Sequence, residues 1–386
     1  MLFNEKILGL AMITHTHSQE PYQSQTKIEE LESIRGLAAL LVVFFHIPKW
    51  NTSLDIGIIN NGYLMVELFF VLSGYVIYNA YAGKITNKSD LFRFQFLRFG
   101  RLYPVHFVFL VAFIFIEIAK YIAQSKLGIA SPNTQPFREN NLTAIFQQIF
   151  LVQAIGPTHN ATTFNGPAWS ISVEFYTYLI FGMSILFVST KKDLLFSLIA
   201  IVSLVLLVSQ TTFGFDDLFR CLAGFFIGCL TALVTKAQKT NIPKYASLLV
   251  LASIVFFLQL KTTKQYDVAI YFLTAALIAT LVLSKNGYLN YVLNLKVLTW
   301  LGSISYAVYM SHAAILWVIN QVIRVILKKP EILISEKYTP QLSNIETLIA
   351  CVLLTLIVLS VSAFVYRFIE KPMREKSRRY AFQTLN

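Results

Sequence analysis

The sequence predicts an all-α, polytopic membrane helical bundle with about ten transmembrane helices and both termini in the cytoplasm. Three observations support this prediction: an apolar composition, regularly spaced apolar runs and an uneven distribution of basic residues. Of the 386 residues, 56% are apolar and 13% are charged, and the mean hydropathy is +0.60. Soluble domains average about 45–50% apolar and about 25% charged residues, so the composition excludes an ordinary soluble protein.

Apolar runs of about 17–25 residues, the length that crosses a bilayer, recur from Arg35 to Ile369. They predict spans at residues 35–50, 63–82, 101–123, 168–189, 194–212, 214–235, 244–260, 266–284, 302–327 and 345–368. The run at 142–155 is apolar but short, which favours a re-entrant or interfacial helix.

Basic residues gather in every second segment between the predicted spans. With the N-terminus in the cytoplasm, the inner segments hold the basic residues at 84–101, 191–192, 236–244, 285–296 and 367–379. The outer segments are poorer in Lys and Arg, with the loop at 328–337 as a mild exception. This positive-inside bias predicts the orientation, and it explains the net charge of +12 without a nucleic-acid partner.

The predicted organisation is a cytoplasmic arm at 1–27, a membrane domain at 28–374 and a basic cytoplasmic tail at 375–386. We therefore expect any chemistry to lie within the membrane bundle. Cys221, Cys229 and Cys351 fall in apolar runs without metal-ligand spacing. No histidine and carboxylate pair has the spacing of a zinc site on one helix, so we expect no metal.

The first predicted span carries Arg35 near its start and His46 near its end. Eleven residues are about three helical turns, so both side chains point to nearly one face, with roughly 16 Å between them along the axis. Intramembrane ionisable groups usually face a bundle interior or a wet cavity. Arg35 is also compatible with a lipid-headgroup anchor, and His46 with a helix-end histidine bonded to backbone. Their shared face favours a site for an extended anionic ligand.

A second basic group opens the third span. Arg98 and Arg101 are three residues apart, hence neighbours on a helix surface, and Arg93 extends the same basic face. Planar guanidinium groups bind phosphate oxygens in bidentate fashion, so these residues are candidates for phosphate capture. An amphipathic interfacial helix bound to anionic lipid is the alternative, and both can hold together.

Further candidate residues lie in the second and fourth spans. Glu67 is an intramembrane carboxylate that needs a partner, such as an arginine or histidine. Ser73, followed by a glycine, is more typical of close helix packing than of a nucleophile. Trp169 suits an interfacial aromatic belt. Ser170 and Glu174 share one helical face at the outer end, where Ser170 either binds acceptor hydroxyls or caps the helix.

The ninth span places Ser305, Tyr309 and His312 on one face. His106 follows a proline without matching partners, and we interpret it as structural. At the end of the last span, we expect Glu370 to pair with a basic residue and Pro372 to stop the helix.

Taken in order, these motifs resemble the acyltransferase 3 family of integral membrane O-acyltransferases over nearly the whole chain, from Ile28 to Arg374. The motifs are Arg35-Gly36 with His46, Phe69-Phe-Val-Leu-Ser-Gly74, Arg98-Phe-Gly-Arg101, Trp169-Ser-Ile-Ser-Val-Glu174, Ser305-Tyr306 with His312, and Glu370-Lys-Pro372. Each motif is weak alone, and the ordered set is specific. Tyr75 and Ser33 are mild departures from the family pattern.

The resemblance implies transfer of an acyl group, often acetyl, from acyl-CoA to a hydroxyl of a sugar, surface glycan or glycolipid. It implies that His46 is catalytic, and it agrees with Arg35, Arg98 and Arg101 as ligands of the coenzyme A phosphates. Glu67, Ser73, Trp169, Ser170, Glu174, Tyr309 and His312 are expected to shape the site or bind the acceptor. The expected location is the bacterial cytoplasmic membrane. Some members carry an additional periplasmic esterase-like domain, which we do not expect here.

Two other classes of protein share some of these features. A polytopic exporter of a glycan or lipid would have a similar number of spans, but secondary transporters typically show internal repeats and broken spans, and neither is evident. A lipid-binding scaffold explains the basic inner face, yet gives His46 no role. Dependence on coenzyme A separates the enzyme from both alternatives.

Overall fold

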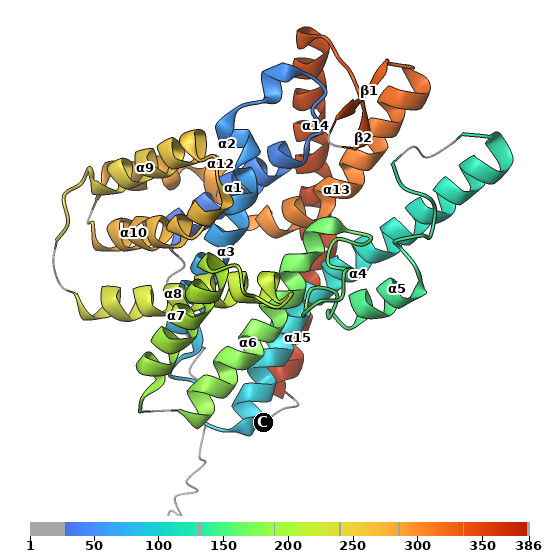
Figure 1. Cartoon of the computed structure of the whole chain (residues 1–386). Coiled ribbons are helices and arrows are strands. Elements are labelled where there is room, and N and C mark those ends of the chain that lie inside the picture. The colour runs from blue at the N-terminus through green and yellow to red at the C-terminus, as the bar shows by residue number, and fades with distance from the viewer. Residues whose placement is uncertain are drawn as a thin grey trace, which may run out of the picture.

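The computed structural model describes residues 28–129, 133–188, 190–238, 241–284, 286–334 and 336–383. The predicted arm at 1–27 lies outside these residues. The described chain is a bundle of helices with one small hairpin, in which β1 (Glu331–Ile334) pairs antiparallel with β2 (Lys337–Pro340) (Figure 1). The all-α prediction is therefore confirmed for the part that is described, apart from this hairpin.

The helices follow one another along the chain with short connections. Their bounds are α1 Glu29–His46, α2 Gly57–Asn60, α3 Met65–Tyr81, α4 Lys88–Leu127, α5 Leu142–Ile149, α6 Trp169–Phe187, α7 Lys192–Val208, α8 Asp216–Ala237, α9 Ala246–Leu260, α10 Ala269–Leu283, α11 Tyr288–Leu293, α12 Lys296–Ser303, α13 Ser305–Gln321, α14 Asn344–Val365 and α15 Lys371–Gln383. Two π-helical segments continue α13 and α14, namely η5 (Val322–Ile326) and η6 (Tyr366–Glu370). Short 3₁₀ turns include η3 (Gly166–Ala168) before α6.

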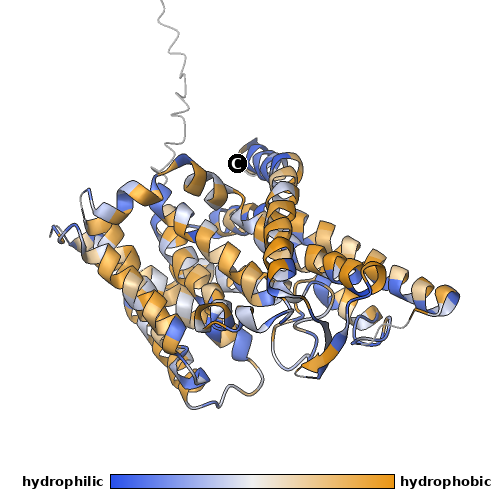
Figure 2. Cartoon of the chain, turned by 90° about the horizontal axis from the view of Figure 1, so that it is seen from above, coloured by the Kyte–Doolittle hydropathy of each residue, from blue (hydrophilic) through white to orange (hydrophobic). Residues whose placement is uncertain are grey.

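Each of the ten predicted spans overlaps a helix. Within the described residues, seven helical stretches are long and apolar enough to cross a membrane, and apolar residues predominate along most of the helices (Figure 2). These stretches are Gly62–Tyr81, Lys88–Leu127, Gly166–Phe187, Asp216–Ala237, Lys264–Leu283, Ser305–Ile326 and Asn344–Gln383. The count of ten spans and the cytoplasmic side of the termini stay predictions. The short run at 142–155 forms only the eight-residue α5.

The expectation that Pro372 stops the last helix is wrong. The chain passes from α14 through η6 into α15, and Pro372 is the second residue of α15. In η6 the N–H of Lys371 bonds to the carbonyl of Tyr366, five residues back, so the α-helical ladder is already interrupted before the proline. A proline and a π-type turn are the usual causes of a tolerated helix bend.

The basic tail is helical as far as it is described. It lies alongside the start of α4 (Figure 1), where the rings of Phe96 and Tyr380 are 5.5 Å apart. A Cβ added at Gly100 would lie 2.0 Å from the Ser377 hydroxyl, which shows how closely the two helices approach. The tail therefore packs against the segment that carries Arg98 and Arg101.

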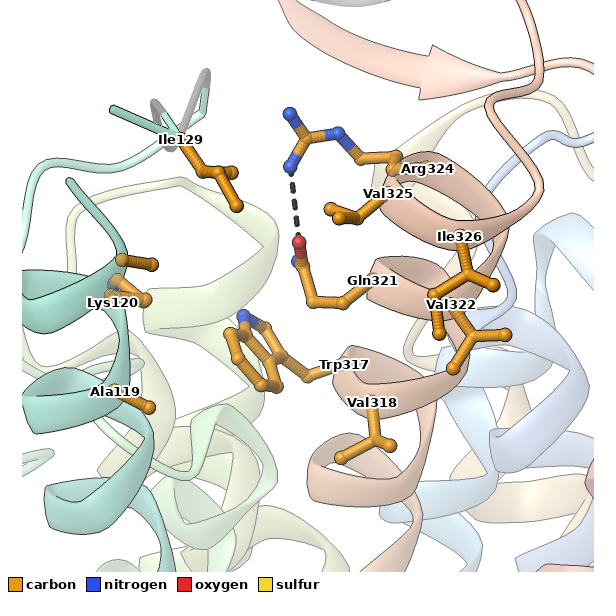
Figure 3. Close-up of a pocket in the computed structure, with 11 residues that line it drawn as sticks. Ala119, Lys120, Ile129, Trp317, Val318, Gln321, Val322, Arg324, Val325 and Ile326 are labelled. Carbon is orange, nitrogen blue, oxygen red and sulfur yellow. Dashed lines mark hydrogen bonds between the residues drawn. The ribbon is translucent and has the colours of Figure 1, made fainter. Parts of the chain in front are cut away.

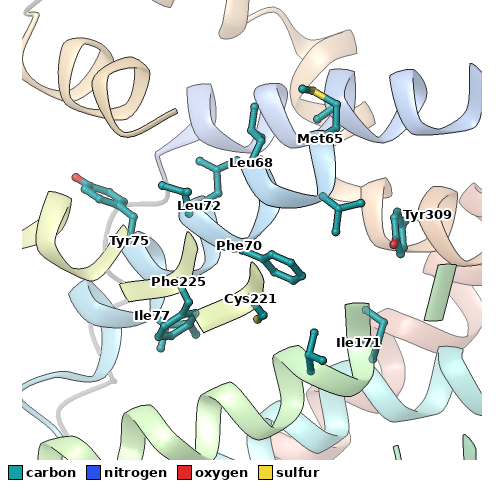
Figure 4. Packing of buried hydrophobic residues seen from close by; sticks show 14 of the residues in the cluster. Met65, Leu68, Phe70, Leu72, Tyr75, Ile77, Ile171, Cys221, Phe225 and Tyr309 are labelled. Atoms are coloured by element: carbon teal, nitrogen blue, oxygen red, sulfur yellow. The ribbon is translucent and has the colours of Figure 1, made fainter. Parts of the chain in front are cut away.

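The centre of the bundle is the crossing of α3 and α8. Figure 4 shows Phe70 of α3 beside Cys221 and Phe225 of α8, with Ile171 of α6 below. Small residues let these backbones approach, as they do at many membrane helix interfaces. A Cβ at Gly74 would lie 1.8 Å from the Phe225 carbonyl oxygen. Close helix packing, predicted for the Ser73-Gly74 pair, is therefore confirmed at Gly74.

We expect Gly74→Ala to destabilise the fold, because the added methyl group meets backbone rather than a movable side chain. Overpacking of this kind costs about 1–3 kcal/mol. The measurement is thermal unfolding of the purified protein in detergent. Gly83→Ala is the matched control, since nothing lies within 4 Å of a Cβ at Gly83. Equal melting temperatures for the two variants would contradict the close helix crossing.

Candidate active site

A small cavity of about 60 Å³ lies inside the bundle, between α1, α3, α4, α6 and α13. Its walls hold apolar side chains of α3 and a set of polar groups from the other four helices. The polar groups are Arg35, Arg101, Ser170, Glu174, Tyr178, Ser305, Tyr306 and Tyr309. The structure thus brings together five of the predicted site residues, from four different spans, around one space.

A larger cavity of about 330 Å³ opens between α4 and the end of α13 with η5 (Figure 3). Trp317, Gln321 and Arg324 line one wall, and Arg324 donates a 3.1 Å hydrogen bond to Gln321 Oε1. None of the predicted site residues lines this cavity. We therefore locate the candidate site at the smaller cavity.

Arg35 and Arg101 form the basic end of the small cavity. Gly36 packs against α12, where its Cβ would lie 2.7 Å from the Gly302 nitrogen, and this close crossing fixes the position of Arg35. Arg35 Nη1 lies 3.6 Å from Glu32 Oε1. Arg101 interacts electrostatically with the carboxylates of Glu32, Glu174 and Glu370. The Glu370 carboxylate interacts electrostatically in turn with Arg101, Arg374 and Arg35, and its pairing with one basic residue stays a prediction.

Arg98 lies in a different environment from Arg101. Its side chain is buried, and Nη2 donates a 3.0 Å hydrogen bond to the Tyr81 hydroxyl. The guanidinium carbon also lies 5.1 Å from the Tyr81 ring centre and 5.9 Å from those of Phe94 and Tyr178. Arg98 does not line the small cavity, but it approaches Tyr178, which does.

Glu174 accepts two short hydrogen bonds at the middle of the cavity. Ser73 Oγ donates at 2.6 Å and the Tyr178 hydroxyl at 2.5 Å, both to Glu174 Oε1. Ser73 and Tyr178 are themselves 2.8 Å apart. The cluster joins α3 to α6 and fixes the orientation of a carboxylate next to Arg101. Ser73 therefore acts as a hydrogen-bond donor to the site.

Two hydroxyl groups form the other end of the cavity. Ser170 Oγ and the Tyr309 hydroxyl are 2.9 Å apart, and each also lies within hydrogen-bond distance of the Pro167 carbonyl, at 3.1 and 2.9 Å. Ser170 makes no cap to α6, whose N-cap residue is Ala168, so the helix-cap alternative is wrong. The hydroxyls instead link α6 to α13.

His46 and His312 lie next to each other, with ring centres 4.8 Å apart. Nδ1 of His46 is 2.9 Å from the Val42 carbonyl, and Nδ1 of His312 is 3.2 Å from the Val308 carbonyl. A carbonyl only accepts, so each Nδ1 carries the hydrogen and each neutral ring leaves Nε2 as an acceptor. His46 is exposed, whereas His312 is fully buried.

The histidine pair adjoins the hydroxyl end of the cavity. The ring centres of Tyr309 and His312 are 5.9 Å apart, and His312 connects in turn to His46. Nε2 of His312 is buried and has no hydrogen-bond partner among the described residues. A buried acceptor without a partner is uncommon and often marks a functional site. The order from one end to the other is arginines, carboxylate, hydroxyls and histidines.

Glu67 has the kind of partner that the sequence analysis expected, an arginine. Arg220 of α8 donates to Glu67 Oε1 from Nε at 2.7 Å and pairs with Asp217 at 2.9 Å. The Arg220 guanidinium stacks on Trp169, 4.3 Å from the ring centre. This Glu67–Arg220 pair fixes the tryptophan that precedes Ser170, so its effect on the cavity is indirect.

We expect Glu67→Gln to lower the free energy of unfolding by about 3 kcal/mol, because breaking a buried ion pair leaves a charge uncompensated. Asp217 still pairs with Arg220, which keeps the loss at the lower end of the usual range. Asp55→Asn is the control: its 2.7 Å pair with Lys49 is exposed, and surface pairs contribute about 0–1 kcal/mol. Chemical unfolding in detergent compares the two. Equal losses would refute the structural role of the Glu67–Arg220 pair.

The family model described as "Acyltransferase domain" matches residues 28–367. This chain belongs to the acyltransferase 3 family. Every residue of the small cavity and of the histidine pair lies within the matched range. With its apolar helices, this member of the family is an integral membrane protein.

Several curated relatives of this acyltransferase 3 protein share about a quarter of its residues. A putative peptidoglycan O-acetyltransferase, YrhL of Bacillus subtilis strain 168, is 26% identical over 92% of this chain and 56% of the relative. O-acetyltransferase OatA of Staphylococcus aureus strain NCTC 8325 is 26% identical over 94% of this chain and 60% of the relative. The peptidoglycan O-acetyltransferase OatA of Listeria monocytogenes is 25% identical over 91% and 56%.

The chain therefore spans between 56% and 60% of the length of these three relatives.

No solved structure matches the chain. Within the described residues of this acyltransferase 3 member, no group of three or more His, Cys, Asp or Glu side chains is placed to hold a metal ion.

Three residues at or next to the site were not predicted from the sequence of this family member. Tyr178 and Tyr306 line the cavity, and Arg220 contacts Glu67 and Trp169. Tyr178 lies four residues after Glu174, so the helical period offered a signal for it. Tyr306 belongs to the Ser305-Tyr306 motif but had no predicted role in the site, and its hydroxyl donates a 2.6 Å hydrogen bond to the Leu102 carbonyl. Arg220 could have been found as an arginine inside an apolar run.

Proposed function

We propose that this chain is a membrane O-acyltransferase that moves an acyl group, with acetyl as the expected group, from acyl-CoA to a hydroxyl of a sugar, surface glycan or glycolipid. The observation that carries the proposal is a cavity with two arginines at one end and, at the other, two hydroxyls that adjoin a pair of neighbouring histidines. The peptidoglycan O-acetyltransferases among its relatives support a glycan acceptor. The bacterial cytoplasmic membrane is the proposed location.

In this proposal the acyl donor follows the line of residues that the cavity marks, and the helices must part to admit it, because about 60 Å³ is too small for a pantetheine arm. The donor phosphates bind Arg35 and Arg101, with Arg98 adding positive charge from its aromatic surroundings, because guanidinium groups suit phosphate oxygens. The thin pantetheine arm then extends past Glu174 towards the hydroxyls of Ser170 and Tyr309. This places the thioester near the histidines, and the positioning of both substrates lowers the entropic part of the barrier.

His46 is the proposed general base. Its Nδ1 is committed to the Val42 carbonyl, so the free Nε2 of an exposed ring can accept the proton of an acceptor hydroxyl. The hydroxyl oxygen attacks the thioester carbon, a C–O bond forms and the C–S bond breaks. The thiolate leaves as coenzyme A and takes up the proton from the His46 imidazolium.

The test uses acetyl-CoA labelled separately in the acetyl group and in the adenine, added to native membrane vesicles with or without the chain. Acyl transfer is expected to move only the acetyl label into a glycan or lipid fraction. Movement of both labels together would indicate binding or transport. If the purified chain binds no acyl-CoA, the proposal fails and an exporter of glycan or lipid becomes the better interpretation.

A further inference from the structure

The hydroxyls of Ser170 and Tyr309 come from different helices and meet at one point of the cavity wall. Ser170 is 4% exposed and Tyr309 is 5% exposed, and both line the cavity. Ser170 belongs to the first turn of α6 and Tyr309 to the second turn of α13. Their oxygens are 2.9 Å apart, so two hydroxyl groups that can donate hydrogen bonds are held side by side by two rigid helices.

The carbonyl that these hydroxyls contact has another hydrogen-bond donor as well. The Pro167 carbonyl accepts hydrogen bonds from both hydroxyls and from the Trp169 N–H. A carbonyl oxygen has two lone pairs, so it stays hydrogen-bonded when a hydroxyl turns to another oxygen. The cost of redirecting a hydroxyl towards a ligand is therefore small.

The surroundings strengthen a hydrogen bond made at this point. Phe69 contacts the Tyr309 ring edge to face, with ring centres 5.9 Å apart and an interplanar angle of 88°, which fixes the ring. Val66, Phe69 and Ile171 supply apolar walls to the same cavity. Apolar walls exclude water, and a fixed donor in a region of low dielectric stabilises developing charge far better than one in water.

The position along the cavity indicates which ligand atom the hydroxyls meet. On one side of them lie Arg101 and Glu174, and on the other lies His312, whose ring is next to His46. An acyl-CoA molecule whose phosphates bind the arginines would extend along the cavity and pass these hydroxyls. Its acyl carbonyl would then lie between them and the proposed base.

We propose that Tyr309 and Ser170 donate hydrogen bonds to the carbonyl oxygen of the acyl thioester and stabilise the oxyanion that forms on it. This inference rests on the proposed acyl transfer and assigns the two residues a catalytic role in it. When the acceptor oxygen attacks, the C=O electron pair moves onto the carbonyl oxygen, where the two hydroxyls hold it. Return of that pair restores the C=O bond and expels the thiolate, which takes the proton from His46.

The decisive variant is Tyr309→Phe, which keeps the ring and removes only the hydroxyl. With acetyl-CoA as donor and native membrane vesicles as the source of acceptor, we expect kcat to fall about 100-fold while the donor KM stays within about threefold. Ser170→Ala is expected to lower kcat in the same way. Release of coenzyme A thiol provides the rate. Tyr176→Phe is the control, because its hydroxyl also donates to a backbone carbonyl, that of Phe150, but is exposed outside the cavity.

A second measurement separates catalysis from structure. S-ethyl-CoA is a thioether without the carbonyl oxygen, so Tyr309→Phe should bind it as tightly as the native chain does. Weaker binding of S-ethyl-CoA, or a native kcat for Tyr309→Phe while His46→Ala is inactive, overturns the oxyanion inference alone. If the native chain turns over no acetyl-CoA at all, the proposed function fails first and the inference falls with it.

Discussion

His46→Ala is expected to lower kcat for acyl transfer by about 10²–10⁴-fold, the usual contribution of a positioned general base. The donor KM should change little, because His46 lies beyond the hydroxyl end of the cavity and away from the arginines. The native Nε2 is free because Nδ1 is bonded to the Val42 carbonyl, and alanine supplies no replacement.

The measurement is the acetyl-CoA turnover of purified native and variant chains at saturating donor. His159→Ala is the control, since His159 is exposed in a loop and lines neither cavity. An unchanged kcat for His46→Ala would remove His46 as the base. The next candidate would then be His312, whose Nε2 is buried without a partner among the described residues.

Helical periodicity alone predicted which residues of one span share a face of the site. Arg35 and His46 share a face because eleven residues are close to three whole turns, a property of one helix alone. The same reasoning placed Ser170 with Glu174 and Tyr309 with His312. All of these except the histidine pair line one cavity, and the pair adjoins it.

Contacts between spans could not be predicted in the same way. The approach of His312 to His46 depends on how α13 crosses α1, and a crossing is set by packing between residues far apart in sequence. The pairing of Glu67 with Arg220 joins residues 153 positions apart. The need for a partner followed from the cost of a buried charge, whereas the identity of the partner did not.

Sequence spacing also could not distinguish the surroundings of Arg98 from those of Arg101. Arg98 and Arg101 are neighbours on α4, and sequence spacing treats them alike. The structure separates them, because Arg98 packs among the rings of Tyr81, Phe94 and Tyr178 while Arg101 lines the cavity. The two side chains point about 60° apart around the helix axis and lie almost one turn apart along it, which is enough to give them different surroundings.

Replacement of Arg101 is therefore expected to weaken acyl-CoA binding more than replacement of Arg98. Truncating one partner of a buried, hydrogen-bonded charge pair costs about 2–5 kcal/mol, so Arg101→Ala should raise the donor KM by roughly 30-fold to several thousandfold. Arg101→Lys keeps the charge but loses the planar fork that matches phosphate oxygens. We expect it to raise the donor KM by about 10- to 100-fold, which corresponds to a charged hydrogen bond of about 1.5–3 kcal/mol.

Equilibrium binding of acetyl-CoA and of free coenzyme A measures this loss directly, since both ligands carry the same phosphates. Arg138→Ala and Arg138→Lys are the matched controls, because Arg138 is exposed in the loop after α4 and lines neither cavity. A drop in kcat with unchanged affinity for both ligands would contradict phosphate binding by Arg101. It would mean that Arg101 acts through Glu174 and Glu370, the carboxylates with which its charge interacts. A loss of affinity shared by both ligands would instead assign the basic end of the cavity to the phosphates of the donor.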